Sequence, residues 1–194
     1  RDAQESRGLG DVYKRQDRDR RYCCTIMEQL NVLVWDVDYC IAPEEPFPAA
    51  VEEAYGIAAY AFDHAEELGI DPDKIILAGH SAGGNLVAAA CLKNAETHRL
   101  HPCCVLMEYF PTDNTVDPLR RLSPELQKDP FWAKRAETEK LYTDFYVGKA
   151  DPADPLCSPA KAADEALASF PDSLILSAGE DSLREDVEAF VLRL

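Results

Sequence analysis

The amino-acid sequence predicts an α/β fold built on a mostly parallel sheet with helices on both faces. Short apolar runs alternate along the chain with longer segments of helical periodicity, which is the order of elements in a sheet whose parallel strands are joined by helices. A glycine-rich turn also follows one of the apolar runs and opens the next helix. In open parallel sheets, such turns lie at the edge where ligands bind.

Four apolar runs are expected to be strands, at 31–37 (NVLVWDV), 74–78 (KIILA), 103–107 and 173–177 (SLILS). Each is short and rich in Val, Ile or Leu, as strands buried on both faces are. The loops that leave the carboxyl ends of these strands are therefore the places to look for a site. They span residues 38–47, 79–83, 108–115 and 178–183.

The segments between these runs favour helices. Apolar residues recur at helical spacing over 47–68, and Gly69 is a typical residue to end that helix. An Ala-rich helix is expected over 82–92, and another begins near Leu183. Residues 22–30 are interpreted as the end of a helix.

The chain is interpreted as one partial domain behind a leader. Residues 1–21 are charged and without periodicity, which predicts disorder. Part of this stretch also resembles translated adapter sequence at the ends of assembled environmental reads, so it is interpreted as a disordered or non-native leader. The domain then covers 22–194. Within it, the polar segment at about 109–160 holds seven of the 13 prolines and is interpreted as a lid-like insertion.

Composition excludes several classes of function. With 36 Asp and Glu against 20 Lys and Arg, the net charge is −16, which disfavours nucleic acid and anionic lipid as partners. No run approaches the roughly 18–20 apolar residues of a membrane span. Seven cysteines without a C-x-x-C spacing predict reduced, buried thiols in a cytoplasmic protein, with no metal site. The oligomeric state is not indicated.

The turn after the predicted strand 74–78 reads Gly79-His80-Ser81-Ala82-Gly83-Gly84. This G-x-S-x-G pattern between a strand and a helix is typical of a nucleophile elbow, in which a strained turn exposes the serine hydroxyl. Glycines two positions on either side of the serine are expected to let neighbouring backbone approach closely. The backbone N–H of Ala82 is the expected oxyanion donor at the helix N-terminus.

Three motifs in the same order resemble the hormone-sensitive-lipase-like serine esterases of the α/β-hydrolase fold. They are GHSAGGN at 79–85, DYCIAPEEPFPAA at 38–50 and AGEDSLRED at 178–186. The second departs from the usual DYRLAPE, because Cys40 and Ile41 stand where the family has Arg and Leu. His80 stands where many members have Asp, a common variant. The resemblance covers nearly all of the chain from Asn31 onward.

The resemblance implies that Ser81 is the nucleophile and Asp181 the acid of a catalytic triad. Asp181 follows the last predicted strand, and Ser182-Leu183-Arg184-Glu185 forms a capping-box pattern that leaves its carboxylate free to orient a histidine.

The base of the triad is missing from the sequence. The family places the histidine after the acid, and none follows Asp181. The four histidines present are poorly placed by their positions along the chain. The HGGG-type loop that supplies the other oxyanion donor in relatives does not precede Asn31 either. The chain is therefore interpreted as a fragment truncated at both ends, and as nearly inactive by itself.

The function expected of the complete protein is hydrolysis of small, short-chain acyl esters through an acyl-enzyme, without a metal or organic cofactor. This makes it a carboxylesterase or lipase-like hydrolase by family. One alternative is a non-catalytic ligand-binding protein on the same fold, as the plant gibberellin receptors of this family are. Amide or peptide substrates also remain open, because the elbow serves those reactions too.

Overall fold

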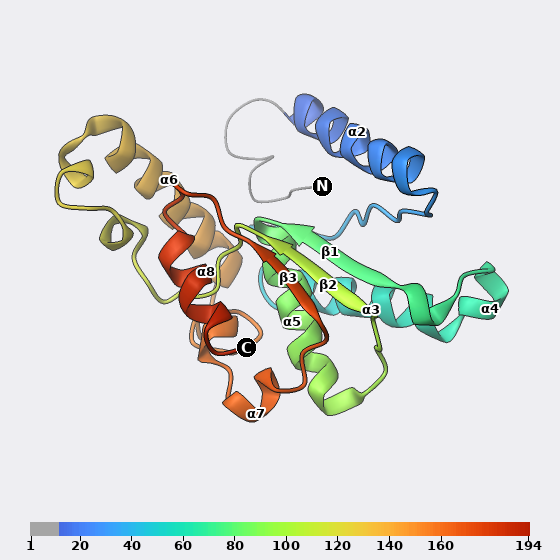
Figure 1. The fold of residues 1–194 in the computed structure, drawn as a ribbon. Coiled ribbons are helices and arrows are strands. Elements are labelled where there is room, and N and C mark those ends of the chain that lie inside the picture. Colours follow the sequence, from blue (N-terminus) through green and yellow to red (C-terminus); the bar gives the residue numbers. More distant parts are fainter. Residues whose placement is uncertain (1–11) are drawn as a thin grey trace.

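The computed structural model describes residues 12–194, with side chains described from Asp19 onward. Its sheet contains the strands β1 (Ile76–His80), β2 (Cys104–Glu108) and β3 (Ser173–Leu176) in the order β1-β2-β3 (Figure 1). Both strand pairs are parallel, with Ile76 opposite Cys104 and Leu106 opposite Leu174. The parallel α/β fold predicted from the sequence is thus confirmed, and three of the four predicted strands are present.

Helices fill the connections between and around these strands. They are α2 (Val12–Leu30), α3 (Ala49–Asp63), α4 (Ala65–Leu68), α5 (Ala82–Thr97), α6 (Pro130–Val147), α7 (Asp164–Leu167) and α8 (Arg184–Val191). Four short 3-10 helices cover Pro72–Lys74, Pro118–Arg121, Leu126–Lys128 and Pro159–Lys161. The helix expected over 47–68 is interrupted at His64, and Gly69 ends it in the left-handed conformation, with φ of 69°.

The core lies between one face of the sheet and helices α5 and α8. Val105 and Met107 of β2 are fully buried there, as are Val187 and Phe190 of α8. The ring of Phe110, just after β2, meets that of Phe190 edge-on at 5.8 Å between centroids. This burial of large apolar side chains supplies most of the free energy that holds α5 against the strands.

Helix α2 lies across the other face of the sheet, at the carboxyl ends of the strands. In β2, Glu108 follows buried Met107, so its side chain points to the opposite face of the sheet. His80 lies beside Glu108 in register and points to the same face. The Tyr22 hydroxyl donates to Glu108 at 3.4 Å, and the Asp19 carboxylate lies 4.0 Å from the His80 ring. The opposite end of this face is open, with Ile76 54% exposed.

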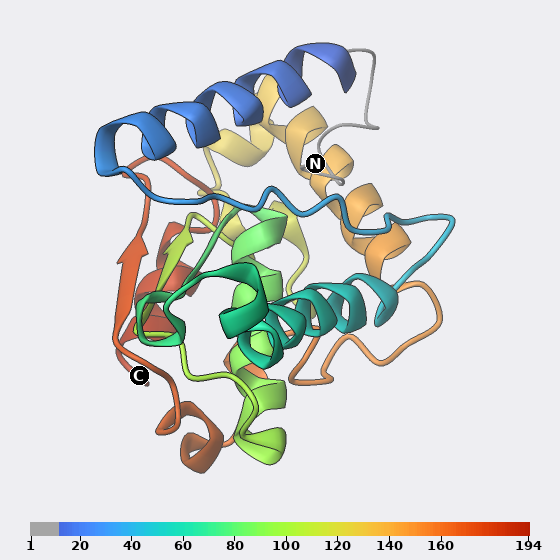
Figure 2. The ribbon, with the colours of Figure 1, turned by 90° about the vertical axis from the view of Figure 1, so that its right-hand side faces the viewer.

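The strand predicted at 31–37 does not form. Residues 32–40 run as an extended segment without strand assignment, which Figure 2 shows beneath α2. The segment pairs with no described strand, since β1 is hydrogen-bonded only to β2 among residues 12–194. A strand without a ladder partner has no backbone bonds to define it. Leu33, expected to be buried, is accordingly 61% exposed.

Residues 12–21, interpreted as part of a disordered or non-native leader, belong in the structure to α2. This helix runs from Val12 to Leu30 and includes the helix end expected at 22–30. A helix satisfies its own backbone hydrogen bonds, so a highly charged segment can adopt it with only a few contacts to the rest of the fold. Residues 1–11 lie outside the described residues, and the non-native origin of the leader stays a prediction.

The segment 109–160 contains more regular structure than its prolines suggested. Asp129 caps α6 by accepting the backbone N–H of Phe131 at 2.8 Å, and Pro130 takes the first helical position, where no N–H is needed. The segment is joined to α8 by Arg121, whose Nε donates to Asp186 at 2.7 Å. Its boundaries and lid-like role stay predictions.

The cysteine prediction is only partly correct. All seven are free thiols, but only Cys91 and Cys157 are buried, while Cys24 and Cys103 are exposed. Burial raises the pKa of Cys91 and of Cys157 to about 12 each. No helix among residues 12–194 is long and apolar enough to cross a bilayer.

We expect iodoacetamide at pH 8 to modify Cys24 and Cys103 within minutes and to leave Cys91 and Cys157 unmodified until denaturant is added. The thiolate is the nucleophile, and burial removes both reagent access and thiolate from the last two. Mass spectrometry of peptides from native and urea-treated protein measures this. Equal labelling of Cys91 and Cys103 in the native protein would contradict the burial pattern.

Thr112 gives a test of packing in the loop after β2. Its hydroxyl is fully buried and has no hydrogen-bond partner among the described residues. Thr112→Val keeps the shape and removes the unpaired group, so it should leave the free energy of unfolding unchanged or raise it by about 1 kcal/mol. Thr112→Ser keeps the hydroxyl and loses a buried methyl, which should cost about 1 kcal/mol. Urea unfolding compares the two, and a less stable valine variant would show an unrecognised partner.

Candidate active site

Ser81 occupies the turn between β1 and α5 in a strained backbone conformation. Its φ is 51° and its ψ is −123°, an arrangement that costs a residue with a side chain about 1–3 kcal/mol. Two bonds hold the turn: Ser81 N–H donates to the Glu108 carbonyl at 2.9 Å, and Gly84 N–H donates to the Ser81 carbonyl at 3.1 Å. The structure therefore contains the strand-turn-helix geometry that the G-x-S-x-G pattern predicts.

Two glycines make this turn sterically allowed, but they are not both the ones expected. A Cβ on Gly79 would overlap the backbone of Gly83 and Gly84, and a Cβ on Gly84 would lie 2.6 Å from Phe110 Cβ. Gly83 has open space where its Cβ would be, so the expectation that this position must be glycine to avoid a clash is wrong. The close contacts fall on Gly84 because the helix rotates that residue toward the sheet.

Ala82 is the first residue of α5, so its backbone N–H belongs to the first turn, where no helical acceptor is available. The N-terminus of a helix of this length carries a partial positive charge of about half an elementary charge. Ala82 is also buried, at 8% exposure, beside a small cavity. This surrounding suits stabilisation of a developing negative charge next to Ser81.

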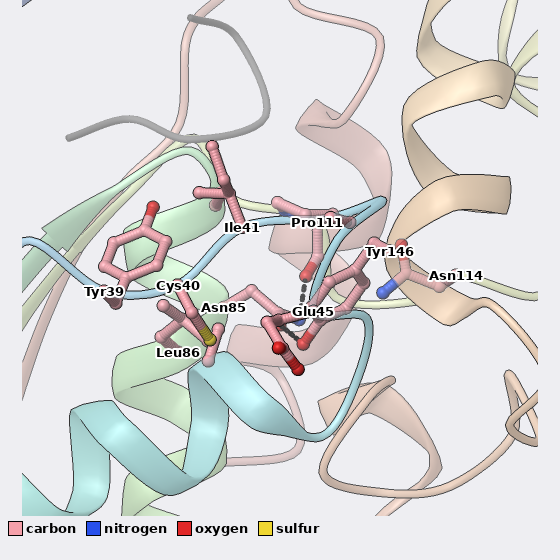
Figure 3. Close-up of a pocket in the computed structure, with 12 residues that line it drawn as sticks. Tyr39, Cys40, Ile41, Glu45, Asn85, Leu86, Pro111, Asn114 and Tyr146 are labelled. Carbon is pink, nitrogen blue, oxygen red and sulfur yellow. Dashed lines mark hydrogen bonds between the residues drawn. The ribbon is translucent and has the colours of Figure 1, made fainter. Parts of the chain in front are cut away.

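The cavity beside Ala82 has a volume of about 20 Å³, room for roughly one water molecule. Three of the four loops predicted to form the site contribute to it (Figure 3). Its lining residues are Tyr39, Cys40, Ile41, Ala42, Glu45, Ala50, Ala82, Asn85, Leu86, Pro111, Asn114 and Tyr146. The loop at 178–183 is not among them.

Cys40, which departs from the family motif, lies in an acidic surrounding. Its backbone N–H donates to the Glu53 carboxylate at 2.5 Å. Burial, together with the nearby carboxylates of Glu53 and Glu45, raises the pKa of the Cys40 thiol to about 11. The thiol is therefore neutral near pH 7 and is a poor candidate for a second nucleophile.

Asn85 and Tyr146 are site residues that sequence reasoning missed. Asn85 lies on α5 and is 2% exposed. Its side-chain nitrogen donates to the Pro111 carbonyl at 2.9 Å and to the Cys157 carbonyl at 3.1 Å, while its oxygen accepts from the Tyr146 hydroxyl at 3.2 Å. The available signal was an Asn at a buried position in an otherwise Ala-rich helix, since a buried amide requires partners.

Asp181 caps the turn that leads into α8. Its Oδ1 accepts the Leu183 N–H at 2.9 Å, whereas the Ser182 hydroxyl points to Glu139 at 3.3 Å. The expected capping box from Ser182 is therefore absent: Leu183 is the N-cap of α8, no described side chain caps that helix, and Asp181 stabilises the turn before it. Among the described residues, the carboxylate of Asp181 has no recorded contact with Ser81 or with a histidine, so its triad role stays a prediction.

The four histidines all have other surroundings. His64 pairs with Glu67 at 2.8 Å, and the His101 ring packs on Phe62 at 4.5 Å. His98 caps the far end of the 16-residue α5, about 24 Å from its start at 1.5 Å per residue. His80 lies beside Asp19 on the α2 side of the sheet. No histidine is recorded in contact with the Ser81 hydroxyl within residues 19–194.

Metal chemistry has no visible basis in the described part of the chain. From residue 19 onward, no group of three or more His, Cys, Asp and Glu side chains is arranged to hold an ion.

This combination of a parallel sheet and a strained serine turn at its edge defines an α/β hydrolase. The sequence pattern of the alpha/beta hydrolase fold family matches residues 8–194, and the chain belongs to this family. Its relatives include carboxylic ester hydrolase LipN of Mycobacterium tuberculosis, 33% identical over 192 residues, and an arylesterase of Saccharolobus solfataricus, 34% identical over 162 residues. These alignments cover 96% and 83% of this chain.

Solved structures agree with this membership. A hormone-sensitive lipase from a metagenome library is 36% identical over 86% of this chain, with a TM-score of 0.69. Carboxyl esterase 2 of Tuber melanosporum is 26% identical over 90% of it, with a TM-score of 0.77. The chain spans about half the length of these proteins: 49% of LipN, 51% of the arylesterase, 54% of the lipase and 56% of the fungal esterase.

Adjacent glycines at the elbow give a matched test of the turn. Gly84→Ala should lower the free energy of unfolding by about 1–3 kcal/mol, because its methyl group overlaps Phe110 in a packed core. Gly83→Ala has space and lies in a helix, so it should raise stability by about 0.5–1 kcal/mol. Urea unfolding monitored by circular dichroism measures both. The geometry would be contradicted if Gly83→Ala were the more damaging change.

Proposed function

We propose that this chain carries the nucleophile of a serine carboxylic-ester hydrolase that acts on short-chain acyl esters. The observation that carries the proposal is the backbone of Ser81, because a conformation that costs energy persists where the surroundings enforce it, and such strain clusters at functional sites. The names of the relatives, which include carboxylic ester hydrolase, arylesterase and hormone-sensitive lipase, support the class of reaction.

The proposed chemistry has two steps. A base removes the Ser81 proton while the hydroxyl oxygen attacks the ester carbonyl, and the resulting oxyanion is held by the Ala82 N–H and by a donor from another loop. The alcohol leaves with the proton returned by the base. Water then attacks the acyl-enzyme and releases the acid, which restores Ser81. Neither step needs a metal or organic cofactor.

We further propose that the base is a histidine supplied by polypeptide outside residues 1–194, oriented by Asp181. The support is geometric, since each of the four histidines has a different surrounding and a general base must be within hydrogen-bond reach of the hydroxyl. The second oxyanion donor is expected from outside these residues too. By themselves, residues 1–194 should hydrolyse esters poorly, because triad members act as a unit.

One alternative has a specific observation in its favour. A protein with an elbow serine and no base would bind a small molecule at Ser81 without turning it over. Among the described residues, no base contacts Ser81, which is what such a binding protein would show. Reading the gene beyond both ends of these residues separates the two. A histidine beyond Leu194 supports the hydrolase, and a continuing frame without one supports the binding protein.

The complete gene product should lose p-nitrophenyl acetate hydrolysis by at least about 10³-fold in Ser81→Ala, because the attacking oxygen is removed. Ser169→Ala is the matched control, since Ser169 is an exposed serine that bonds only locally, to the Ala166 carbonyl at 2.7 Å. Steady-state rates corrected for folded protein provide the comparison. Hydrolysis that survives in Ser81→Ala would remove Ser81 from the nucleophile role.

A further inference from the structure

Asn85 is a buried polar residue that the proposed reaction does not use. It is 2% exposed and lies on a helix whose neighbouring positions are Ala, Gly, Leu and Val. An amide at such a place lowers stability unless both its ends are bonded. Both ends are bonded here, through two donated bonds and one accepted bond. This position of the helix therefore serves hydrogen bonds to other segments rather than apolar packing.

The three partners of Asn85 come from three separate segments. Pro111 lies in the loop after β2, Tyr146 is near the end of α6, and Cys157 comes after α6. Figure 3 shows the side chain of Asn85 between Pro111 and Tyr146, with the bonds to both drawn. Burial raises the pKa of the Tyr146 phenol, which keeps it protonated as a donor. One side chain of α5 is therefore fixed by three parts of the fold.

The bonds of Asn85 act on the elbow because it lies one helical turn after Ser81. Its own N–H points to the Ser81 carbonyl at 3.4 Å, and Ala82 lies on the same first turn of α5. Fixing Asn85 therefore fixes the rotation of this turn about the helix axis and its depth against the sheet. These two quantities set the direction of the Ser81 hydroxyl and of the Ala82 N–H.

We propose that Asn85 is a positioning residue, which holds Ser81 and Ala82 in the geometry that acyl transfer requires. The proposal rests on the proposed esterase function. Its effect is on the transition state rather than on substrate binding, because the side chain is 2% exposed and both ends of its amide are already bonded within the protein. A displacement of about 1 Å at a reacting group can slow a reaction by roughly 10²-fold.

Asn94 provides a matched control on the same helix. Its side-chain nitrogen donates to the Leu100 carbonyl at 2.7 Å, and its side-chain oxygen accepts the Leu100 N–H at 2.7 Å. Asn94 lies about 14 Å further along α5 than Asn85, at 1.5 Å per residue, and it does not line the cavity beside Ala82. Removing its amide therefore disturbs the far end of α5 without releasing the elbow.

The experiment measures kcat and KM for p-nitrophenyl acetate in the complete gene product, corrected for folded protein. Asn85→Ala should lower kcat at least about 10-fold and leave KM within about twofold, because ground-state binding is unaffected. Asn94→Ala should keep kcat within about twofold of the parent, whatever its loss of thermal stability. A structural role alone would lower the folded fraction in both variants and leave kcat per folded molecule unchanged.

Two outcomes of this comparison overturn the proposal. An unchanged kcat in Asn85→Ala, or an equal fall in kcat in Asn94→Ala, removes the positioning role. If Asn85→Ala does not fold, Tyr146→Phe decides, because it removes one bond to Asn85 and keeps the ring. A fall in kcat with constant KM supports the proposal, and an unchanged kcat overturns it. Hydrolysis that persists in Ser81→Ala is a separate result that refutes the esterase function itself.

Discussion

The close approach of backbone to backbone at the serine turn is the constraint on which the rest of the described fold depends. The chain reverses from β1 into α5 within a few residues, and this requires that Gly79 and Gly84 have no side chain. The same contact brings α5 down onto β1 and β2, where Val105 and Met107 are buried beneath it. Strain at the turn and burial in the core are therefore coupled, because the second offsets the first.

Hydrogen bonds of buried polar groups extend this constraint beyond the sheet. Asn85 connects α5 to the segments at Pro111, Tyr146 and Cys157, so the 109–160 region is bonded directly to the helix that begins at the elbow. The ion pair between Arg121 and Asp186 and the hydrogen bond that the Ser182 hydroxyl donates to Glu139 join the same region to α8 and to the turn before it. These contacts explain why a proline-rich segment holds a defined conformation.

Family membership and the positions of the four histidines together indicate what this part of the fold contains. The chain belongs to the alpha/beta hydrolase fold family and spans about half of the relatives it matches. The serine turn is formed within this half. Among the described residues, no histidine contacts the Ser81 hydroxyl. The sheet also has an open face, on which Ile76 and Leu174 are exposed. The serine turn and the contacts that hold it are thus built inside this part of the fold.

The sequence by itself determined the parallel fold, the strand-turn-helix at Ser81 and the order of β1, α5, β2 and β3, because these follow from apolar periodicity and from glycines at fixed spacing. Tertiary structure decided the rest. An apolar run such as 31–37 becomes a strand only if another strand lies beside it, and periodicity contains no information on that neighbour. The contacts of Gly84 and Asn85 are with residues distant in sequence, which packing alone brings together.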